Sequence, residues 1–273
     1  MAVNIRWLGT AGMELGHDGR VILLDPYLSR PGTWDILFMP LMPRKDIIER
    51  YLGSIEGKVR AVIVGHTHFD HTLDIPEIAH RLDCPILGGI SLDALLDISG
   101  LPGRTTLCRA QEKIPLGDGS ALTMIPSRHG LILSRLLLLE GNIDRSLRPP
   151  LRANQYRLGD MFAIKITIGG VVFLHVGSAG FLDKELEGHR CDVLLLCVAG
   201  WKSSAGYPER VIEIAQPSCV VPIHFDNFSK PLLPGRECPV MKFADLEGFT
   251  RHVRISHPGV EVRQLNPYMS ASF

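Results

Sequence analysis

One short stretch limits the fold more than any other. An apolar run at residues 59–64 (VRAVIV) ends at a glycine and is followed at once by the polar sequence HTHFDH. A six-residue run of this kind is typical of a strand buried inside a sheet. In an extended chain, side chains two positions apart point to the same side, so His66, His68 and Asp70 can converge on one spot. The side chain of His71 needs the turn that follows. The pattern predicts a buried strand whose carboxyl end carries histidine and aspartate.

Similar apolar runs bounded by glycine or proline recur along the chain. Near the N-terminus three of them follow one another closely, which favours an antiparallel meander. Residues 161–180 are typical of a hairpin that turns at Gly169-Gly170. The runs expected as strands are NIRWLG, AGMELG and RVILLDP before the histidine segment, PILGG and ALTMIPSRHG after it, and DVLLLCVAG and CVVPIHFDN in the second half.

Helical periodicity appears between these runs. Residues 44–52 and 74–82 carry apolar side chains at helical spacing, and Asp74 is expected to cap the second of these helices. Ser91 is expected to cap a helix over residues 92–98. Two further helices are expected over residues 207–216 and 244–253.

Strands and helices occur together in both halves, which favours an α/β fold of two mixed sheets with helices on both outer faces. A length of 273 residues is enough for one large domain. We expect a single domain over residues 1–273, built from two similar halves at roughly 1–130 and 160–273. The stretch between them, residues 131–160, is expected to be a loop or lid over a site. A packed surface helix without a functional role is the alternative.

Charge and cysteine usage restrict the class of partner. The chain has 29 basic and 29 acidic residues, which disfavours broad attraction to nucleic acid or to an anionic membrane. Its six cysteines form no Cys-x-x-Cys pair, as expected of reduced, buried thiols. No signal peptide is evident, and the longest apolar runs are too short to span a membrane. We therefore expect a cytoplasmic protein that acts on a small molecule, while its oligomeric state stays open.

The sequence His66-Thr67-His68-Phe69-Asp70-His71 is the segment that carries chemistry. Imidazole and carboxylate are ligands that suit zinc and neighbouring divalent metals. Such polar groups are costly to desolvate together unless a cation neutralises them. The pattern indicates a metal site, and a polar loop of hydrogen-bonded histidines is the alternative.

This segment resembles the metallo-β-lactamase superfamily, whose αββα fold, a four-layer sandwich, carries H-x-H-x-D-H. The resemblance covers nearly the whole chain, and the opening WLGTAGMEL…VILLDPYLS looks like the branch that includes ascorbate-phosphate lactonase and N-acyl phosphatidylethanolamine phospholipase D. In that family one metal is held by the two leading histidines and a later one, and a second by the aspartate, the third histidine and a histidine near the C-terminus. The matching residues here are His66, His68 and His129 for the first metal, and Asp70, His71 and His224 for the second.

One position departs from the family pattern. Many members carry an aspartate that bridges the two metals, whereas Ser178 stands at the matching turn here. A neutral hydroxyl is a poorer ligand for a divalent ion than a carboxylate, so the second site should be weaker. A dinuclear site and a single tightly held metal both stay open. The resemblance implies one or two zinc ions, with manganese or iron as alternatives.

Two further residues are candidates around the metals. Asp25 matches a family aspartate that orients a metal-bound histidine, and a turn-capping role before Pro26 is the alternative. His175 lies three residues before Ser178 and is a candidate for the rim of the site.

Such a centre would make hydroxide from water near neutral pH, and Asp70 would hold or orient that nucleophile. The expected activity is hydrolysis of an ester, lactone or amide carbonyl. Loss of the bridging aspartate disfavours phosphodiester hydrolysis, which stays an alternative, as does a metal-binding homologue without activity. The leucine-rich stretch at 131–139 suggests a substrate with an apolar portion, unless those leucines belong to the core.

Overall fold

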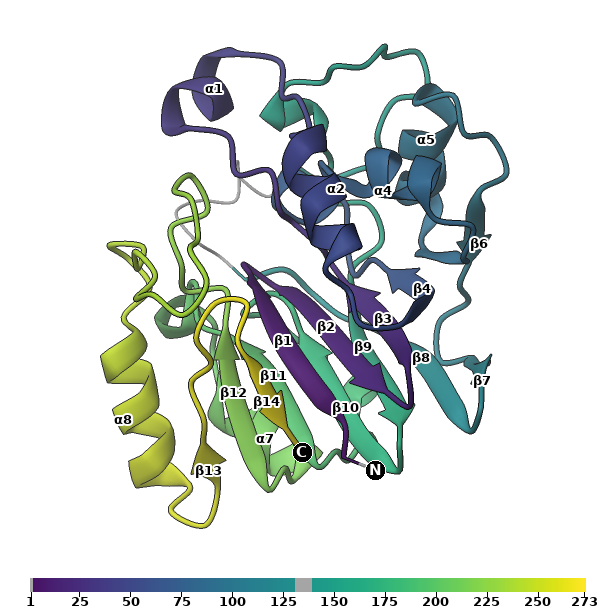
Figure 1. The fold of residues 1–273 in the computed structure, drawn as a ribbon. Helices are drawn as coiled ribbons and strands as arrows, with labels where there is room; N and C mark the ends of the chain where they lie inside the picture. The colour runs from purple at the N-terminus through teal and green to yellow at the C-terminus, as the bar shows by residue number, and fades with distance from the viewer. Residues whose placement is uncertain (1, 131–138) are drawn as a thin grey trace.

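The computed structural model describes residues 2–130 and 139–273, and the strands within these ranges form two sheets of seven strands each (Figure 1). The first sheet runs, in spatial order, β14 (Ser270–Ser272), β1 (Asn4–Gly9), β2 (Gly12–His17), β3 (Arg20–Leu24), β4 (Lys58–Ile63), β5 (Ile86–Gly88) and β6 (Thr105–Leu107). The second runs β13 (Glu261–Val262), β12 (Cys219–Ile223), β11 (Val193–Cys197), β10 (Val171–Val176), β9 (Phe162–Ile168), β8 (Ser120–Pro126) and β7 (Lys113–Gly117). The expected meander is β1-β2-β3, and β9-β10 is the expected hairpin.

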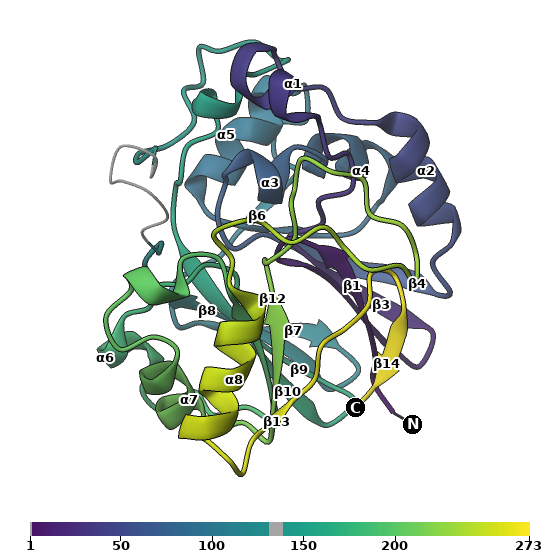
Figure 2. The same ribbon diagram turned by 90° about the vertical axis from the view of Figure 1, so that its left-hand side faces the viewer.

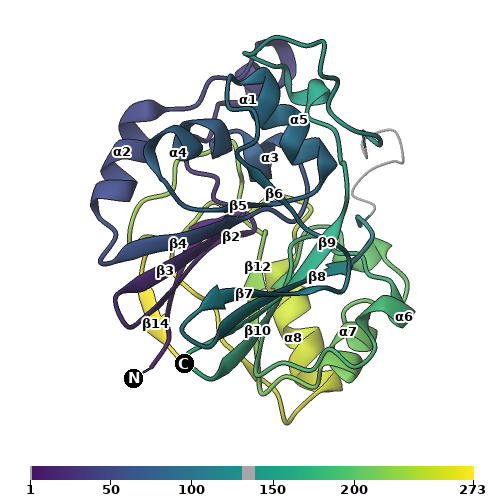
Figure 3. The ribbon, with the colours of Figure 1, turned by 90° about the vertical axis from the view of Figure 1, so that its right-hand side faces the viewer.

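Helices cover the outer face of each sheet, with α2, α4 and α5 over the first and α6, α7 and α8 over the second (Figure 3). The expected four-layer arrangement is confirmed. The helices described are α1 (Thr33–Phe38), α2 (Lys45–Gly53), α3 (Phe69–Thr72), α4 (Ile75–Arg81), α5 (Ile90–Ile98), α6 (Asp183–Leu186), α7 (Glu209–Ala215) and α8 (Leu246–Ser256).

The strand β3 shows how the layers are held together. Ile22 and Leu24 belong to the cluster between the two sheets, whereas Val21 and Leu23 belong to the cluster under α2 and α4. Because successive side chains of a strand point to opposite faces, a strand covered on both faces is apolar throughout. This explains why the buried strands of this chain are near-continuous apolar runs.

Parallel pairing brings several strand ends to one edge of the sandwich. β3 pairs in parallel with β4, and β10, β11 and β12 pair in parallel in the other sheet. β8 has the direction of β10, because both are antiparallel to β9. The loops that follow β3, β4, β8, β10 and β12 therefore leave from corresponding strand ends, where binding residues of α/β sheets gather.

Of the two expected helix caps, one is confirmed in position and one is wrong. Asp74 is the N-cap residue of α4, but its side chain makes no capping hydrogen bond. Its buried carboxylate instead accepts hydrogen bonds from the backbone N–H groups of Leu28 and Ser29, at 2.5 and 2.9 Å. Ser91 lies inside α5, behind Gly89, and its hydroxyl accepts a hydrogen bond from the N–H of Ile143. Both side chains make long-range contacts instead of local ones.

The expected loop or lid at residues 131–160 is described in part, because residues 131–138 lie outside the described ranges. Residues 139–160 lie beside α1 and α5 (Figure 2) and contain one 3-10 turn, Ala153–Gln155, rather than a surface helix. Three of their side chains, Ile143, Leu151 and Tyr156, are buried against Tyr27 and Leu95.

Among residues 2–130 and 139–273, no helix is both long enough and apolar enough to span a bilayer.

Candidate metal centre

Three loops from the shared edge of the sandwich carry the candidate ligands. The segment His66–His71 follows β4 and winds into α3, His129 follows β8, and His224 follows β12. Because β4 belongs to one sheet and β8 and β12 to the other, the packing of the two sheets brings together ligands that are far apart in the sequence. The structure brings all six candidate ligands into two groups.

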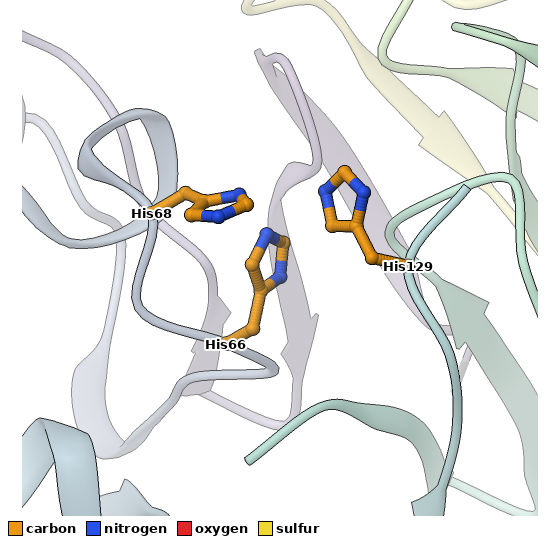
Figure 4. A group of neighbouring side chains, drawn as sticks. All are labelled: His66, His68 and His129. Carbon is orange, nitrogen blue, oxygen red and sulfur yellow. The ribbon is translucent and has the colours of Figure 1, made fainter. Parts of the chain in front are cut away.

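The first group consists of His66, His68 and His129 (Figure 4). One ring nitrogen from each lies within 4.8 Å of those of the other two. His66 and His68 come from one loop, and the ring of His129 reaches toward them from the other sheet. Three imidazoles that converge from two sheets form an arrangement that can grip one cation.

The second group consists of Asp70, His71 and His224, again with one ligand atom from each within 4.8 Å of the others. The Nε2 atom of His224 lies 3.2 Å from Oδ2 of Asp70. The rings of His66 and His71 have centroids 3.8 Å apart, so the two groups adjoin. The geometry offers two neighbouring three-ligand positions.

Burial sets the protonation of the first group. His66 is buried, and neither of its ring nitrogens has a hydrogen-bond partner among the described residues. Burial lowers the pKa of His66, and the neighbouring His71 and His68 lower it further. Burial, with a contribution from His68, also lowers the pKa of His129 to about 3. Neutral imidazole is the form that ligates metals, and an unpaired buried polar atom is costly. The donor set therefore fits a divalent cation.

Charge separation marks the second group. Burial alone would raise the pKa of the Asp70 carboxyl, but the imidazoles of His71 and His224 hold it below its ordinary value. Burial alone would lower the pKa of His71, but the carboxylates of Asp25 and Asp70 raise it above its ordinary value. Asp70 is therefore ionised throughout the neutral range.

Asp25 lies directly behind the second group. Its Oδ2 atom is 2.9 Å from Nδ1 of His71, and its Oδ1 atom accepts a hydrogen bond from the N–H of Gly65 at 2.7 Å. These contacts reach the loop after β4 rather than the turn before Pro26, where the alternative reading would have put them. Asp25 thus leaves Nε2 of His71 to face the group.

Ser178 connects two of the loops. Its hydroxyl oxygen accepts a hydrogen bond from the N–H of Gly130, the residue after His129, at 3.0 Å. The loops pack so closely that a Cβ on Gly130 would lie 2.6 Å from the carbonyl oxygen of Ala179, and one on Gly180 would lie 2.2 Å from that of Arg128. Ser178 therefore holds the loop that carries His129.

His175 belongs to neither group. It is buried, and its Nε2 atom lies 2.7 Å from the carbonyl oxygen of Ala11. Burial lowers its pKa, although Asp25 opposes the shift. The structure places its ring against the backbone of Ala11 and outside both three-ligand groups, so a role at the rim of the site stays a prediction.

Sequence reasoning missed Asp226, two residues after His224. Its buried carboxylate accepts a hydrogen bond from the N–H of Thr10 at 2.8 Å and pairs with the guanidinium of Arg30 at 2.6 Å. The N–H of His224 also donates to the carbonyl oxygen of Thr10. The signal was present in the polar run HFDN after an apolar strand, but only the histidine was singled out.

The chain also matches known proteins. Residues 4–224, a range that holds all six candidate ligands, match the family model described as the beta-lactamase superfamily domain. A metal-dependent hydrolase from Pyrobaculum arsenaticum is 27% identical over 262 residues, which cover 94% of this chain and 98% of that protein.

Two solved structures resemble the fold. One is Igni18, a metallo hydrolase from Ignicoccus hospitalis, with a TM-score of 0.68, 19% identity and coverage of 100% of this chain and 99% of that one. The other is an isothiocyanate hydrolase from Delia radicum gut bacteria, with a TM-score of 0.63, 16% identity and coverage of 99% of both chains.

Proposed function

This chain belongs to the metallo-β-lactamase superfamily, and we propose that it is a metal-dependent hydrolase. The observation that carries the proposal is His66, which is buried with both ring nitrogens unpaired among the described residues and has His68 and His129 beside it. The relative from Pyrobaculum arsenaticum, which is named a metal-dependent hydrolase and which this chain matches over nearly its whole length, adds support.

The metal ligands in this proposal are the two groups of side chains. His66, His68 and His129 hold a first cation, and the group around Asp70 holds a second. Three neutral imidazoles favour zinc, with manganese or iron as alternatives. Ser178 supplies no carboxylate between the groups, so the second cation binds more weakly than the first.

A divalent cation bound there would act as a Lewis acid and would lower the pKa of the water that it binds to about 7. Asp70 is the catalytic residue: its carboxylate stays ionised and accepts a hydrogen bond from the attacking water. Asp25 fixes the ring of His71 from behind. Ser178 fixes the loop of His129 through Gly130.

The substrate in this proposal is a small molecule with an ester, lactone or amide carbonyl. A carbonyl needs one polarising cation, whereas phosphodiester hydrolysis favours two tightly held ions. The branch with ascorbate-phosphate lactonase and N-acyl phosphatidylethanolamine phospholipase D supplies the nearest reactions by resemblance. We further propose that residues 1–273 form one cytoplasmic domain, with residues 139–160 bordering the site.

Elemental analysis of the purified protein, combined with a panel of substrates, tests the function. The panel holds lactones, esters, amides, an isothiocyanate and bis(p-nitrophenyl) phosphate. Bound zinc with turnover of a carbonyl substrate, abolished by a chelator and restored by zinc, is the expected result. Turnover of the phosphodiester alone would replace the carbonyl proposal. Bound zinc without any turnover would favour a binding protein.

A further inference from the structure

Thr67 stands between two candidate ligands, and its side chain makes contacts of its own. It is buried, and its Oγ1 atom lies 2.7 Å from Oγ of Ser91 and 2.5 Å from the carbonyl oxygen of Arg157. The hydroxyl of Ser91 in turn accepts a hydrogen bond from the N–H of Ile143 at 3.0 Å.

These contacts form a continuous chain from Ile143 to Arg157. The N–H of Ile143 donates to Ser91, and the hydroxyl of Thr67 donates toward both Ser91 and the carbonyl of Arg157. Because a hydroxyl has a single proton, Thr67 shares that proton between these two acceptors. Two side-chain hydroxyls thus join α5 and the loop of His66 to both ends of the segment 143–157.

The backbone repeats the connection. The N–H of Thr67 donates to the carbonyl of Leu158 at 3.0 Å, and the N–H of Phe162 donates to that of Gly65 at 2.9 Å. Gly159 lies against the hydroxyl pair: a Cβ there would be 2.4 Å from Cβ of Ser91 and 3.0 Å from Oγ1 of Thr67. No side chain fits between the segment and the pair.

The orientation of Thr67 bears directly on its neighbours. Side chains of an extended segment alternate in direction, so a residue held outward fixes the residues on either side toward the opposite face. A hydroxyl locked on the carbonyl of Arg157 therefore holds His66 and His68 toward His129.

We propose that Thr67 and Ser91 are positioning residues, which couple the segment 139–160 to the cation held by His66 and His68. The inference rests on the proposed function. Because coupling is reciprocal, zinc at the first group stabilises the segment, and an ordered segment strengthens zinc binding. A substrate or partner that displaces the segment would weaken the grip on the first cation.

The test uses Thr67→Val, which keeps the side-chain shape and removes the hydroxyl, and Thr67→Ser, which restores it. Zinc affinity is measured by competition with a chelator, and hydrogen exchange of residues 139–160 is measured with and without zinc. Thr67→Val should weaken the tighter zinc about tenfold, equal to about 1.4 kcal/mol. It should also abolish the slowing of exchange that zinc produces in the wild type. Thr67→Ser should stay within about twofold of the wild type.

Ser91→Ala removes the other hydroxyl and keeps the test decisive if Thr67→Val does not fold. Ser99→Ala is the matched control, because Ser99 follows the same helix and its hydroxyl donates a local hydrogen bond to the carbonyl of Leu95. Wild-type zinc affinity and exchange in both Thr67→Val and Ser91→Ala would overturn the inference and leave the function standing. A wild-type protein that binds no zinc, manganese or iron would overturn the proposed function and the coupling with it.

Discussion

Asp25 and His71 are paired at the base of the site: Oδ2 of the aspartate lies 2.9 Å from Nδ1 of the histidine, and both side chains are 1% exposed. The pair fixes which nitrogen of His71 is free to face Asp70 and His224. Outer partners of this kind orient a ligating histidine and raise its basicity.

Asp25→Asn should therefore weaken the second cation 10- to 100-fold, the usual effect of losing such a partner. The amide keeps the size of the side chain but not its charge. Metal titration followed by elemental analysis measures the loss. Asp18→Asn, at an exposed turn, is the control, and an unchanged second affinity in Asp25→Asn would remove Asp25 from the site.

His68→Ala should strip the first cation and abolish hydrolysis while leaving the fold intact. The residue lies in a loop beyond β4 and contributes nothing to the clusters between the layers. Zinc content, turnover and circular dichroism measure the three effects. His189→Ala, at a half-buried histidine that contacts Gln111 and lies outside both groups, should change none of them. Unfolding of His68→Ala would mean that the metal is structural.

Ser178→Asp should raise the affinity for a second cation, because it puts a carboxylate at the turn where, by resemblance, related proteins carry an aspartate that bridges two metals. A carboxylate oxygen can still accept the hydrogen bond from Gly130 that Ser178 accepts now. Isothermal titration with zinc gives the stoichiometry. Ser218→Asp, whose hydroxyl bonds the carbonyl of Asp192, is the control. If both variants bind as many ions as the wild type with the same affinities, Ser178 does not adjoin the second cation.

Asp226→Asn should lower the free energy of unfolding by about 3–5 kcal/mol, because it leaves the buried guanidinium of Arg30 without its counter-charge. The amide oxygen retains the hydrogen bond from Thr10. Urea unfolding of the metal-free protein measures the change. Asp144→Asn, at an exposed aspartate that accepts a hydrogen bond from the N–H of Ser146, should cost far less. Equal costs would show that the Arg30 pair contributes little.

Gly159→Ala should destabilise the protein more than Gly170→Ala does. Both glycines have positive φ, +65° and +83°, so both variants share the backbone strain of about 1–2 kcal/mol. Only the first adds a collision with Ser91, since a Cβ on Gly170 has nothing within 4 Å. Thermal unfolding of the two variants side by side measures the difference. Equal losses of stability in the two variants would mean that the segment 139–160 can shift to make room for the added methyl group.

The strands could be predicted from the sequence, whereas the long-range polar contacts could not. The long buried strands are predicted by their own apolar runs, which are bounded by glycine or proline, as the turn at Gly169-Gly170 illustrates. The side-chain oxygens of Asp74 and Ser91 were assigned to the nearest helix, yet they bond N–H groups 46 and 52 residues away. Which distant N–H group an oxygen meets depends on packing that no local pattern records.

The candidate site divides in the same way. Convergence of His66 with His68 followed from alternation along the chain, whereas the inclusion of His129 and His224 came from resemblance. The roles of Thr67 and Asp226 became visible only when their partners, far away in the sequence, were located.

The close packing of Gly130 on Ala179, and of Gly180 on Arg128, fixes the loops after β8 and β10 rigidly against each other. Any side chain larger than hydrogen at either glycine would have to push the two loops apart and carry the ring of His129 with them. Directed evolution aimed at new selectivity should therefore leave these two positions alone. The segment 139–160 is a better target for such substitutions, because hydroxyl groups rather than steric contacts join part of it to the loop of His66.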